Sequence, residues 1–270
     1  SSALEQALTD AEMTVTPEEI FFGNCAMGSW GQSNIKGQVA LQGAVQQKIL
    51  PEGLPIHNIE GGCATGSLTF GGALRAVQSG SCRTALAIGV EKLLFPDDPK
   101  MLKSFPIFLS GIDQIHPEEW KTHQQTQAQM NDLAFAPHPY RVVFLDVHAL
   151  KAPAAIKDGW LNEYMLAQIA AQNHNQGAKN PLAQYRFELT PDQIAQDRKI
   201  IGPLTRSMCS PVSDGAAAIL ICSEEHLKTL SSSVQERAIE IGAFEISGGR
   251  MRGLNDPSVT EEAAKKLYSR

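Results

Sequence analysis

The sequence of 270 residues has little of what marks several large classes of protein. It contains no block of Lys and Arg, and its formal net charge of −6 argues against a nucleic-acid partner. No apolar run approaches the roughly 20 residues that a membrane-spanning helix needs, and no signal-peptide pattern leads the chain. Internal repeats and low-complexity tracts are also missing. We therefore expect a globular protein with no nucleic-acid or membrane partner.

The cysteines and histidines follow no spacing typical of disulfides or metal sites. Five cysteines, an odd number without regular spacing, suit a reducing compartment, so we expect a cytoplasmic location. No two histidines have the short spacing with a carboxylate or thiolate that a metal needs. We therefore expect no metal site, and surface positions for most of the seven histidines, which include His116, His123, His138, His148 and His174.

Helical and extended patterns alternate along the first ninety residues, and 43% of the chain is hydrophobic, which is enough for a sizeable core. The alternation predicts parallel strands joined by right-handed crossovers. Because a parallel-sheet domain normally begins with a strand, the helix at the start suggests a segment upstream. The patterns predict helices over 1–13, 37–49, 64–79 and 260–268 and strands over 19–23, 55–59, 84–89, 213–222 and 238–247. The fully apolar run 213–222 reads as a central buried strand.

The stretch from about 95 to 180 differs from the rest because prolines punctuate it and aromatic residues and histidines gather in it. Residues 157–173 fit an amphipathic helix. Thr190 before Pro191 is a typical helix start, with threonine as the N-cap and proline at the first position.

The most informative stretch runs from Asn58 to Val77, where a short strand, a glycine turn and a helix of small residues meet at Cys63. Gly61 and Gly62 allow backbone angles that a side chain would forbid. The first turn of a helix has unpaired N–H groups and a partial positive charge, which favour the nucleophilic thiolate. The same amides could hold the oxyanion of a thioester under attack. The alternative is a buried structural cysteine beside glycines needed for packing.

The segment Glu60-Gly-Gly-Cys-Ala-Thr-Gly-Ser67, followed by Ala85-Leu-Ala-Ile-Gly-Val-Glu-Lys92, resembles the active-site region of the thiolase superfamily. Asn173-His-Asn, Asn180-Pro-Leu-Ala-Gln-Tyr-Arg186 and the run from Pro203 to Ala218 are similar to the sterol-carrier-protein-2 type of thiolase. The resemblance is weakest over about 95–155. It implies an α/β, thiolase-like core with a parallel-rich five-stranded sheet, helices on both faces and an inserted loop domain. Residues 1–94 and 190–270 would form the N-terminal core domain. Residues 95–189 would form the loop domain, which covers the acyl-CoA.

The resemblance also implies a function. It points to an acyltransferase of lipid metabolism that cleaves or forms 3-ketoacyl-CoA through an acyl group on Cys63. Coenzyme A and acyl-CoA would be substrates, with no permanently bound cofactor. Ser210 matches a serine that touches the pantetheine arm of CoA, although a turn role before Pro211 is nearly as plausible. Asp214 reads as a structural residue that fixes the turn into the next strand. Cations for the CoA phosphates have no individual support; the candidates are Arg141, Lys151, Lys179, Arg186 and Arg206.

In the thiolase family the second catalytic base comes from a second core domain, and this chain has no Gly-His-Pro turn or Cys-x-Gly loop that could supply it. His57 precedes the cysteine turn and reads as an edge or interface residue. The family also implies a homodimer or tetramer, with residues 54–59 as an interface strand, and possibly a small accessory subunit.

Two other functions remain open. One is a thiolase-like aldolase, which cleaves a carbon–carbon bond of an acyl-CoA without a covalent thioester. The other is a non-catalytic acyl-CoA- or lipid-binding subunit. An α/β-hydrolase elbow does not fit, because Thr65 stands where that motif needs its second glycine.

Overall fold

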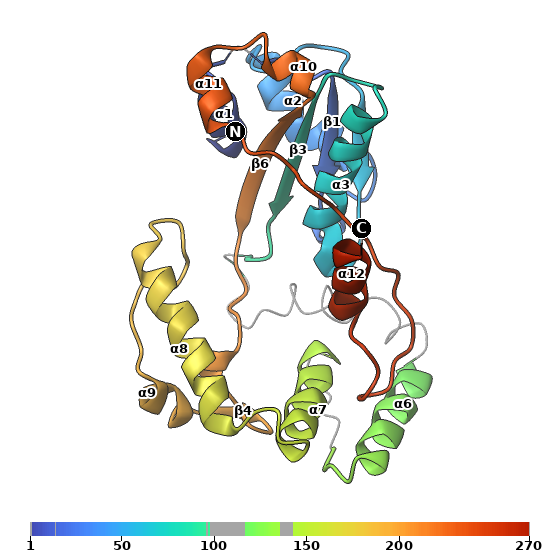
Figure 1. The fold of residues 1–270 in the computed structure, drawn as a ribbon, viewed down its shortest axis with the longest axis vertical. Helices are drawn as coiled ribbons and strands as arrows, with labels where there is room; N and C mark the ends of the chain where they lie inside the picture. Colours follow the sequence, from blue (N-terminus) through green and yellow to red (C-terminus); the bar gives the residue numbers. More distant parts are fainter. Residues whose placement is uncertain (1, 14, 96, 98–116, 136–142, 270) are drawn as a thin grey trace. The chain divides into compact units, whose positions relative to one another are not determined.

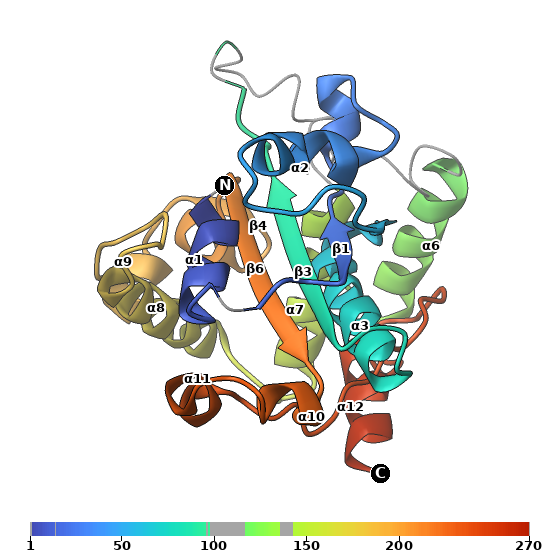
Figure 2. The same ribbon diagram turned by 90° about the horizontal axis from the view of Figure 1, so that it is seen from above.

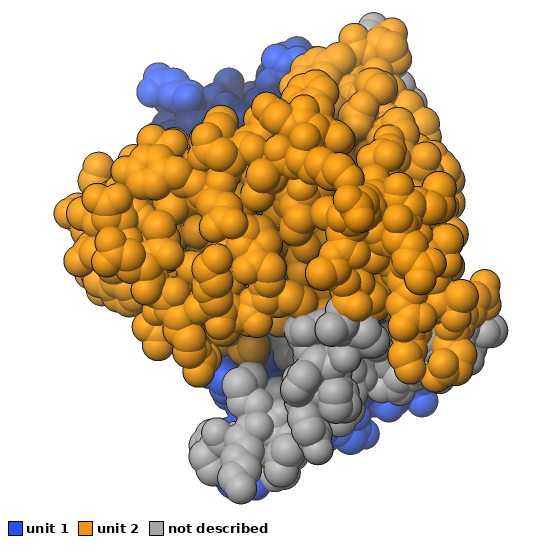
Figure 3. Space-filling view, turned by 90° about the horizontal axis from the view of Figure 1, so that it is seen from below, with its two compact units in different colours: residues 1–98, 213–244 blue, residues 99–212, 245–270 orange. Residues whose placement is uncertain are grey.

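The computed structural model describes residues 2–13, 15–95, 97, 117–135 and 143–269 (Figure 1). They belong to two compact units, coloured separately in Figure 3. Unit 1 comprises Ser1–Asp98 and Ser213–Phe244, and unit 2 comprises Pro99–Val212 and Glu245–Arg270. Segments 190–212 and 245–270, which the resemblance assigned to the core domain, thus cluster with unit 2.

Unit 1 is built on a four-stranded sheet in the order β2-β1-β3-β6. Its strands are β1 (Glu19–Gly23), β2 (Ile56–Ile59), β3 (Thr84–Glu91) and β6 (Gly215–Cys222). β1 pairs in parallel with β2 and β3, in the register Gly23 with Ile59 and with Gly89. The predicted parallel-rich α/β sheet is confirmed. It has four strands in the part of the chain described, rather than the five expected.

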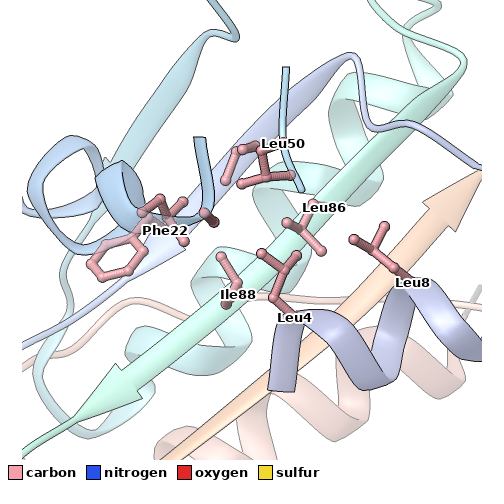
Figure 4. Close-up of a cluster of buried hydrophobic side chains, with 9 residues drawn as sticks. Leu4, Leu8, Phe22, Leu50, Leu86 and Ile88 are labelled. Atoms are coloured by element: carbon pink, nitrogen blue, oxygen red, sulfur yellow. The ribbon is translucent and has the colours of Figure 1, made fainter. Parts of the chain in front are cut away.

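One face of the sheet carries α1 (Ser2–Asp10) and α2 (Lys36–Gln46) (Figure 2). Figure 4 shows how Leu4 and Leu8 of α1 point toward Phe22 of β1 and toward Leu86 and Ile88 of β3. Their side chains are almost wholly buried, because the apolar positions of a helix and of alternate strand residues fall on one face.

The opposite face carries α3 (Thr65–Gln78), whose Ala73 and Leu74 pack on Phe21, Ala85 and Ala87. Gly80, with φ of 77°, ends this helix as predicted, since its amide and that of Ser81 bond back to Val77 and Ala76. Helices therefore cover both faces of the sheet, as expected. The helices α10 (Glu224–Leu227) and α11 (Ser232–Arg237) complete the unit.

Two strand predictions are wrong. β6 is not a central buried strand: it lies at the edge of the described sheet, antiparallel to β3, and Ile219 in it is 50% exposed. An apolar run does not by itself decide whether a strand is central or at an edge, and in β6 only Ile221 is buried. Residues 238–247 form no strand, because Ile241 and Phe244 pack against the α3 side of the core instead of pairing.

Unit 2 is largely helical in its described residues. Its elements are α6 (Pro117–Met130), α7 (Val143–Lys157), α8 (Glu163–Lys179), α9 (Pro191–Ala195), β4 (Lys199–Ile201), β5 (Leu204–Thr205) and α12 (Val259–Tyr268). Helix α8 packs with α9, and α7 contacts the β4–β5 hairpin. The helix expected over 157–173 is wrong in its bounds. Lys157 ends α7, Gly159 has φ of 76°, and Asn162 caps the start of α8.

The predicted start at Thr190 is confirmed as a capping box with Gln193. Among the described residues, none of the helices is both long and apolar enough to cross a bilayer. The cytoplasmic location stays a prediction.

Candidate functional site

The carboxyl ends of β1, β2 and β3 lie at the same edge of the sheet, because the three strands are parallel. Each strand is followed there by chemically active side chains: Cys25 after β1, Glu60 and Cys63 after β2, and Lys92 after β3, whose last residue is Glu91. Ligands of parallel α/β sheets bind outside this edge. It is therefore the candidate site of unit 1.

Cys63 lies in a short 3-10 turn, η2 (Gly62–Ala64), and α3 begins at Thr65 rather than at the cysteine itself. Gly62 has φ of 57°, a left-handed conformation that favours glycine. The Gly61 amide donates to Thr65 Oγ1 at 3.0 Å, and that hydroxyl donates to the Gly62 carbonyl at 2.7 Å. Cys63 is exposed, so the alternative of a buried structural cysteine does not hold in unit 1.

A carboxylate joins this turn to the neighbouring loop. Glu60 Oε1 accepts the Gly62 amide at 2.8 Å and lies 3.8 Å from Cys25 Sγ. On its other side, Cys25 donates its amide to Glu91 Oε1 at 2.5 Å. Glu91 Oε2 accepts the Ala26 amide at 3.0 Å. The loops after β1 and β2 are thus tied to each other and to the end of β3.

The other four cysteines have thiols with raised pKa values. Burial, followed by the charges of Glu60 and Glu91, raises the pKa of the Cys25 thiol. Burial also raises the pKa of the thiols of Cys82, Cys209 and Cys222. At neutral pH these four thiols stay protonated, which makes them poor nucleophiles.

Ser210 belongs to unit 2, whereas Cys63 belongs to unit 1. Ser210 lines a cavity of about 710 Å³ whose wall includes the rings of His174, Tyr185 and Phe187. The ring centroids of Tyr185 and Phe187 are 5.4 Å apart, and those of His174 and Phe187 are 5.3 Å apart. The wall combines these rings and aliphatic side chains with several polar and charged groups, and the volume is within the usual range of a small-molecule site.

Charged groups lie at the same cavity. Arg206 also lines it, with its Nε 3.4 Å from Asp197 Oδ2, while 70% of its side chain is exposed. Asp197 accepts hydrogen bonds from the hydroxyl and the amide of Ser207. The bond from the hydroxyl is the main reason why the pKa of the Asp197 carboxyl group is lowered. Arg206 is therefore the one described cation candidate for the CoA phosphates that lines this cavity. Lys151, Lys179 and Arg186 do not line it, and Arg141 lies outside the described residues.

Two further expectations concern structural residues. Asp214 is structural as predicted: it accepts the Leu93 and Leu94 amides at 2.7 and 2.9 Å and pairs with Lys92. His57 lies on the edge strand β2, with its ring stacked on Phe21 at 4.5 Å and Nε2 2.9 Å from Glu19 Oε2. His174 is not a surface histidine, since it is half-buried and bonded to the Ser207 carbonyl at 3.1 Å. His123 is also half-buried, whereas His116 and His138 lie outside the described residues.

Sequence reasoning missed the roles of Glu60 and Glu91. The available signal was position, since each carboxylate directly follows or ends an extended apolar run, at what becomes the carboxyl edge of the sheet. A lone glutamate at a strand end looks like an ordinary solvated residue until the neighbouring loops are placed beside it.

The family follows from a comparison with known sequences. A sequence model of the thiolase N-terminal domain matches residues 1–201, so the chain belongs to the thiolase family. This agrees with the resemblance of the cysteine segment and with the parallel-rich fold.

Particular relatives refine this picture. The chain is 25% identical over 219 residues to benzoylsuccinyl-CoA thiolase subunit BbsB of Thauera aromatica, covering 80% of this chain and 49% of that one. It is 29% identical over 169 residues to an acetyl-CoA acetyltransferase of Methanothermobacter thermautotrophicus, covering 63% of this chain and 38% of that one. It is 27% identical over 241 residues to rat sterol carrier protein 2, covering 85% of this chain and 40% of that one. The chain thus spans less than half the length of these relatives.

Solved structures support the fold alone. An Ltp2–ChsH2(DUF35) aldolase matches with a TM-score of 0.54 and 15% identity, over 96% of this chain and 60% of that one. The dimeric peroxisomal thiolase of Saccharomyces cerevisiae matches with a TM-score of 0.51 and 15% identity, over 83% and 55%.

Proposed function

We propose that this chain carries the acyl acceptor of a thiolase-type acyl-CoA acyltransferase, with Cys63 as the nucleophile. The observation that carries the proposal is the exposed thiol of Cys63 in a glycine turn directly before α3, at the carboxyl edge of the parallel strands. The turn directly precedes the N-terminal end of α3, where a helix dipole carries its partial positive charge.

In the proposed reaction the Cys63 thiolate attacks the 3-keto carbonyl of a 3-ketoacyl-CoA. A bond forms between sulfur and that carbon, and the bond between carbons 2 and 3 breaks. The electron pair leaves on the acetyl-CoA enolate, which takes up a proton, and the acyl group stays on Cys63. A CoA thiol then accepts the acyl group. Ser210 and Arg206 are proposed to contact the pantetheine arm and a phosphate of CoA, since both line the unit 2 cavity.

Passing the acyl group to CoA needs a base that activates the CoA thiol, and in the family that base belongs to a second core domain. A positioned base typically contributes about 10²–10⁴-fold to the rate. Acylation of Cys63 is therefore the step that tests this proposal.

The test mixes the 270-residue chain with acetoacetyl-CoA and follows it by intact mass. We expect a burst of acetyl adduct that Cys63→Ala abolishes. An adduct that survives Cys63→Ala would contradict the proposed nucleophile.

A thiolase-like aldolase is the second candidate, favoured by the fold shared with the Ltp2–ChsH2(DUF35) aldolase. Cleavage of a 3-hydroxyacyl-CoA with no adduct on Cys63 would support it. A non-catalytic acyl-CoA-binding subunit would bind acyl-CoA and give neither result. A homodimer or tetramer is a further proposal. So is a small accessory subunit, since that aldolase is named as a complex of two components.

A further inference from the structure

Glu60 contacts both of the loops that carry cysteines at the sheet edge. Its Oε1 atom accepts the Gly62 amide and lies 3.8 Å from Cys25 Sγ. The loop of Cys25 is itself held by Glu91, through the Cys25 amide at 2.5 Å and the Ala26 amide at 3.0 Å. Contacts therefore run without a break from the end of β3, through Cys25 and Glu60, to the turn of Cys63.

The turn of Cys63 is short and depends on bonds from outside it. Gly62 has a left-handed conformation, and its amide donates to the Glu60 carboxylate. From the helix side, the buried Thr65 hydroxyl bonds Gly61 and Gly62. Thr65 moves with α3, whereas Glu60 connects the turn to the loop of another strand. The position of Cys63 relative to the rest of the sheet edge is therefore set in part by Glu60.

We propose that Glu60 is a positioning residue for Cys63, which fixes the η2 turn against the Cys25 loop so that the thiolate meets the acyl carbonyl in the reactive orientation. The inference rests on the proposed role of Cys63 as acyl acceptor. The bond to Gly62 needs an acceptor oxygen, not a charge. A glutamine at position 60 keeps that oxygen, and an alanine removes it.

The experiment measures single-turnover acylation by acetoacetyl-CoA at increasing concentration, which separates the maximal rate from the half-saturating concentration. A misplacement of about 1 Å can cost on the order of 10²-fold, so we expect Glu60→Ala to lower the maximal rate by roughly 10- to 100-fold. The half-saturating concentration stays unchanged. Glu60→Gln keeps a rate close to that of the unaltered chain. Glu52→Ala is the matched control, because Glu52 is an exposed glutamate before β2.

A second readout separates orientation from general reactivity. Iodoacetamide is small and needs no particular approach, so its rate at Cys63 is expected to be the same in Glu60→Ala and in the unaltered chain. Equal slowing of alkylation and acylation would overturn a positioning role, as would a glutamine variant as slow as the alanine variant.

Stability and function are controlled separately. A large drop in melting temperature for Glu60→Ala together with loss of substrate saturation would make Glu60 a folding residue and overturn the inference. If the unaltered chain is acylated and Glu60→Ala is acylated at the same rate, the role of Glu60 is overturned, while the proposed function is not. Absence of any adduct on the unaltered chain would overturn the proposed function itself.

Discussion

At the scale of single residues, exposure and charge separate Cys63 from the other thiols. Cys82 is only 4% exposed, and burial raises the pKa of the thiols of Cys25, Cys82, Cys209 and Cys222. Only the thiolate reacts readily, and a raised pKa lowers its fraction at neutral pH. The surroundings of the five thiols therefore differ, and Cys63 is the exposed one.

We therefore predict that Cys63 is the first of the five cysteines to react with iodoacetamide at neutral pH. Peptide mass spectrometry after short exposure locates the label. The other four thiols are expected to label slowly at neutral pH, because burial raises their pKa values. Faster labelling of Cys25 or Cys82, with Cys63 inert in the folded chain, would contradict this.

At the scale of elements, two glycines inside helices differ in how closely the helix approaches the sheet. A Cβ added at Gly72 of α3 would lie 2.7 Å from Phe21 Cδ1 of β1, and Phe21 is buried. A Cβ added at Gly43 of α2 would meet nothing within 4 Å. The two glycines have the same helix propensity but different packing.

Alanine at these two positions is therefore predicted to have opposite effects. Gly72→Ala overpacks the interface of α3 and the sheet, and we expect it to destabilise by about 1–3 kcal/mol. Gly43→Ala removes backbone freedom at an open position and is expected to stabilise by up to about 1 kcal/mol. Chemical denaturation with both variants checks this. Equal and small effects would show that Phe21 moves aside without cost.

The helix start at Thr190 permits a similar test in unit 2. Its hydroxyl accepts the Gln193 amide at 3.2 Å, and the Gln193 side chain accepts the Thr190 amide at 2.8 Å. We expect Thr190→Ala to cost about 1 kcal/mol, because it removes the N-cap acceptor. The control is Thr122→Ala, at an exposed position within α6. A melting temperature that falls as much for the control would argue against the cap.

At the scale of the whole molecule, the sheet of unit 1 ends at β2, a four-residue strand at its edge. A free strand edge invites pairing with another chain, and a closed twofold contact is the common solution. Only part of this edge is covered within the described residues: the Gln38 side chain donates to the Ile56 carbonyl at 3.2 Å.

We predict that the chain self-associates through β2. Sedimentation velocity at micromolar concentration is expected to show a dimer that dissociates on dilution. A single monomeric species across that range would count against it.

The sequence by itself determined those elements whose signals are local. Alternating and apolar runs bounded by glycine and proline located β1, β2 and β3. A threonine before a proline located the start of α9 at Thr190, and a glycine that accepts a left-handed conformation located the end of α3 at Gly80. Cys63 was singled out in the same way, because a glycine turn before a helix is a property of neighbouring residues. A helix cap depends on residues three or four apart, and a strand pattern on alternate residues. Both signals can therefore be read from a single sequence.

Only the tertiary structure decided the rest. The apolar run of β6 fits a central or an edge strand equally well, and the run 238–247 packs its Phe244 on α3 instead of pairing. The roles of Glu60 and Glu91 depend on loops that are brought together only when β1, β2 and β3 align. Burial and hydrogen bonding between distant segments are properties of the folded chain, which is why the composition and spacing of residues do not reveal them.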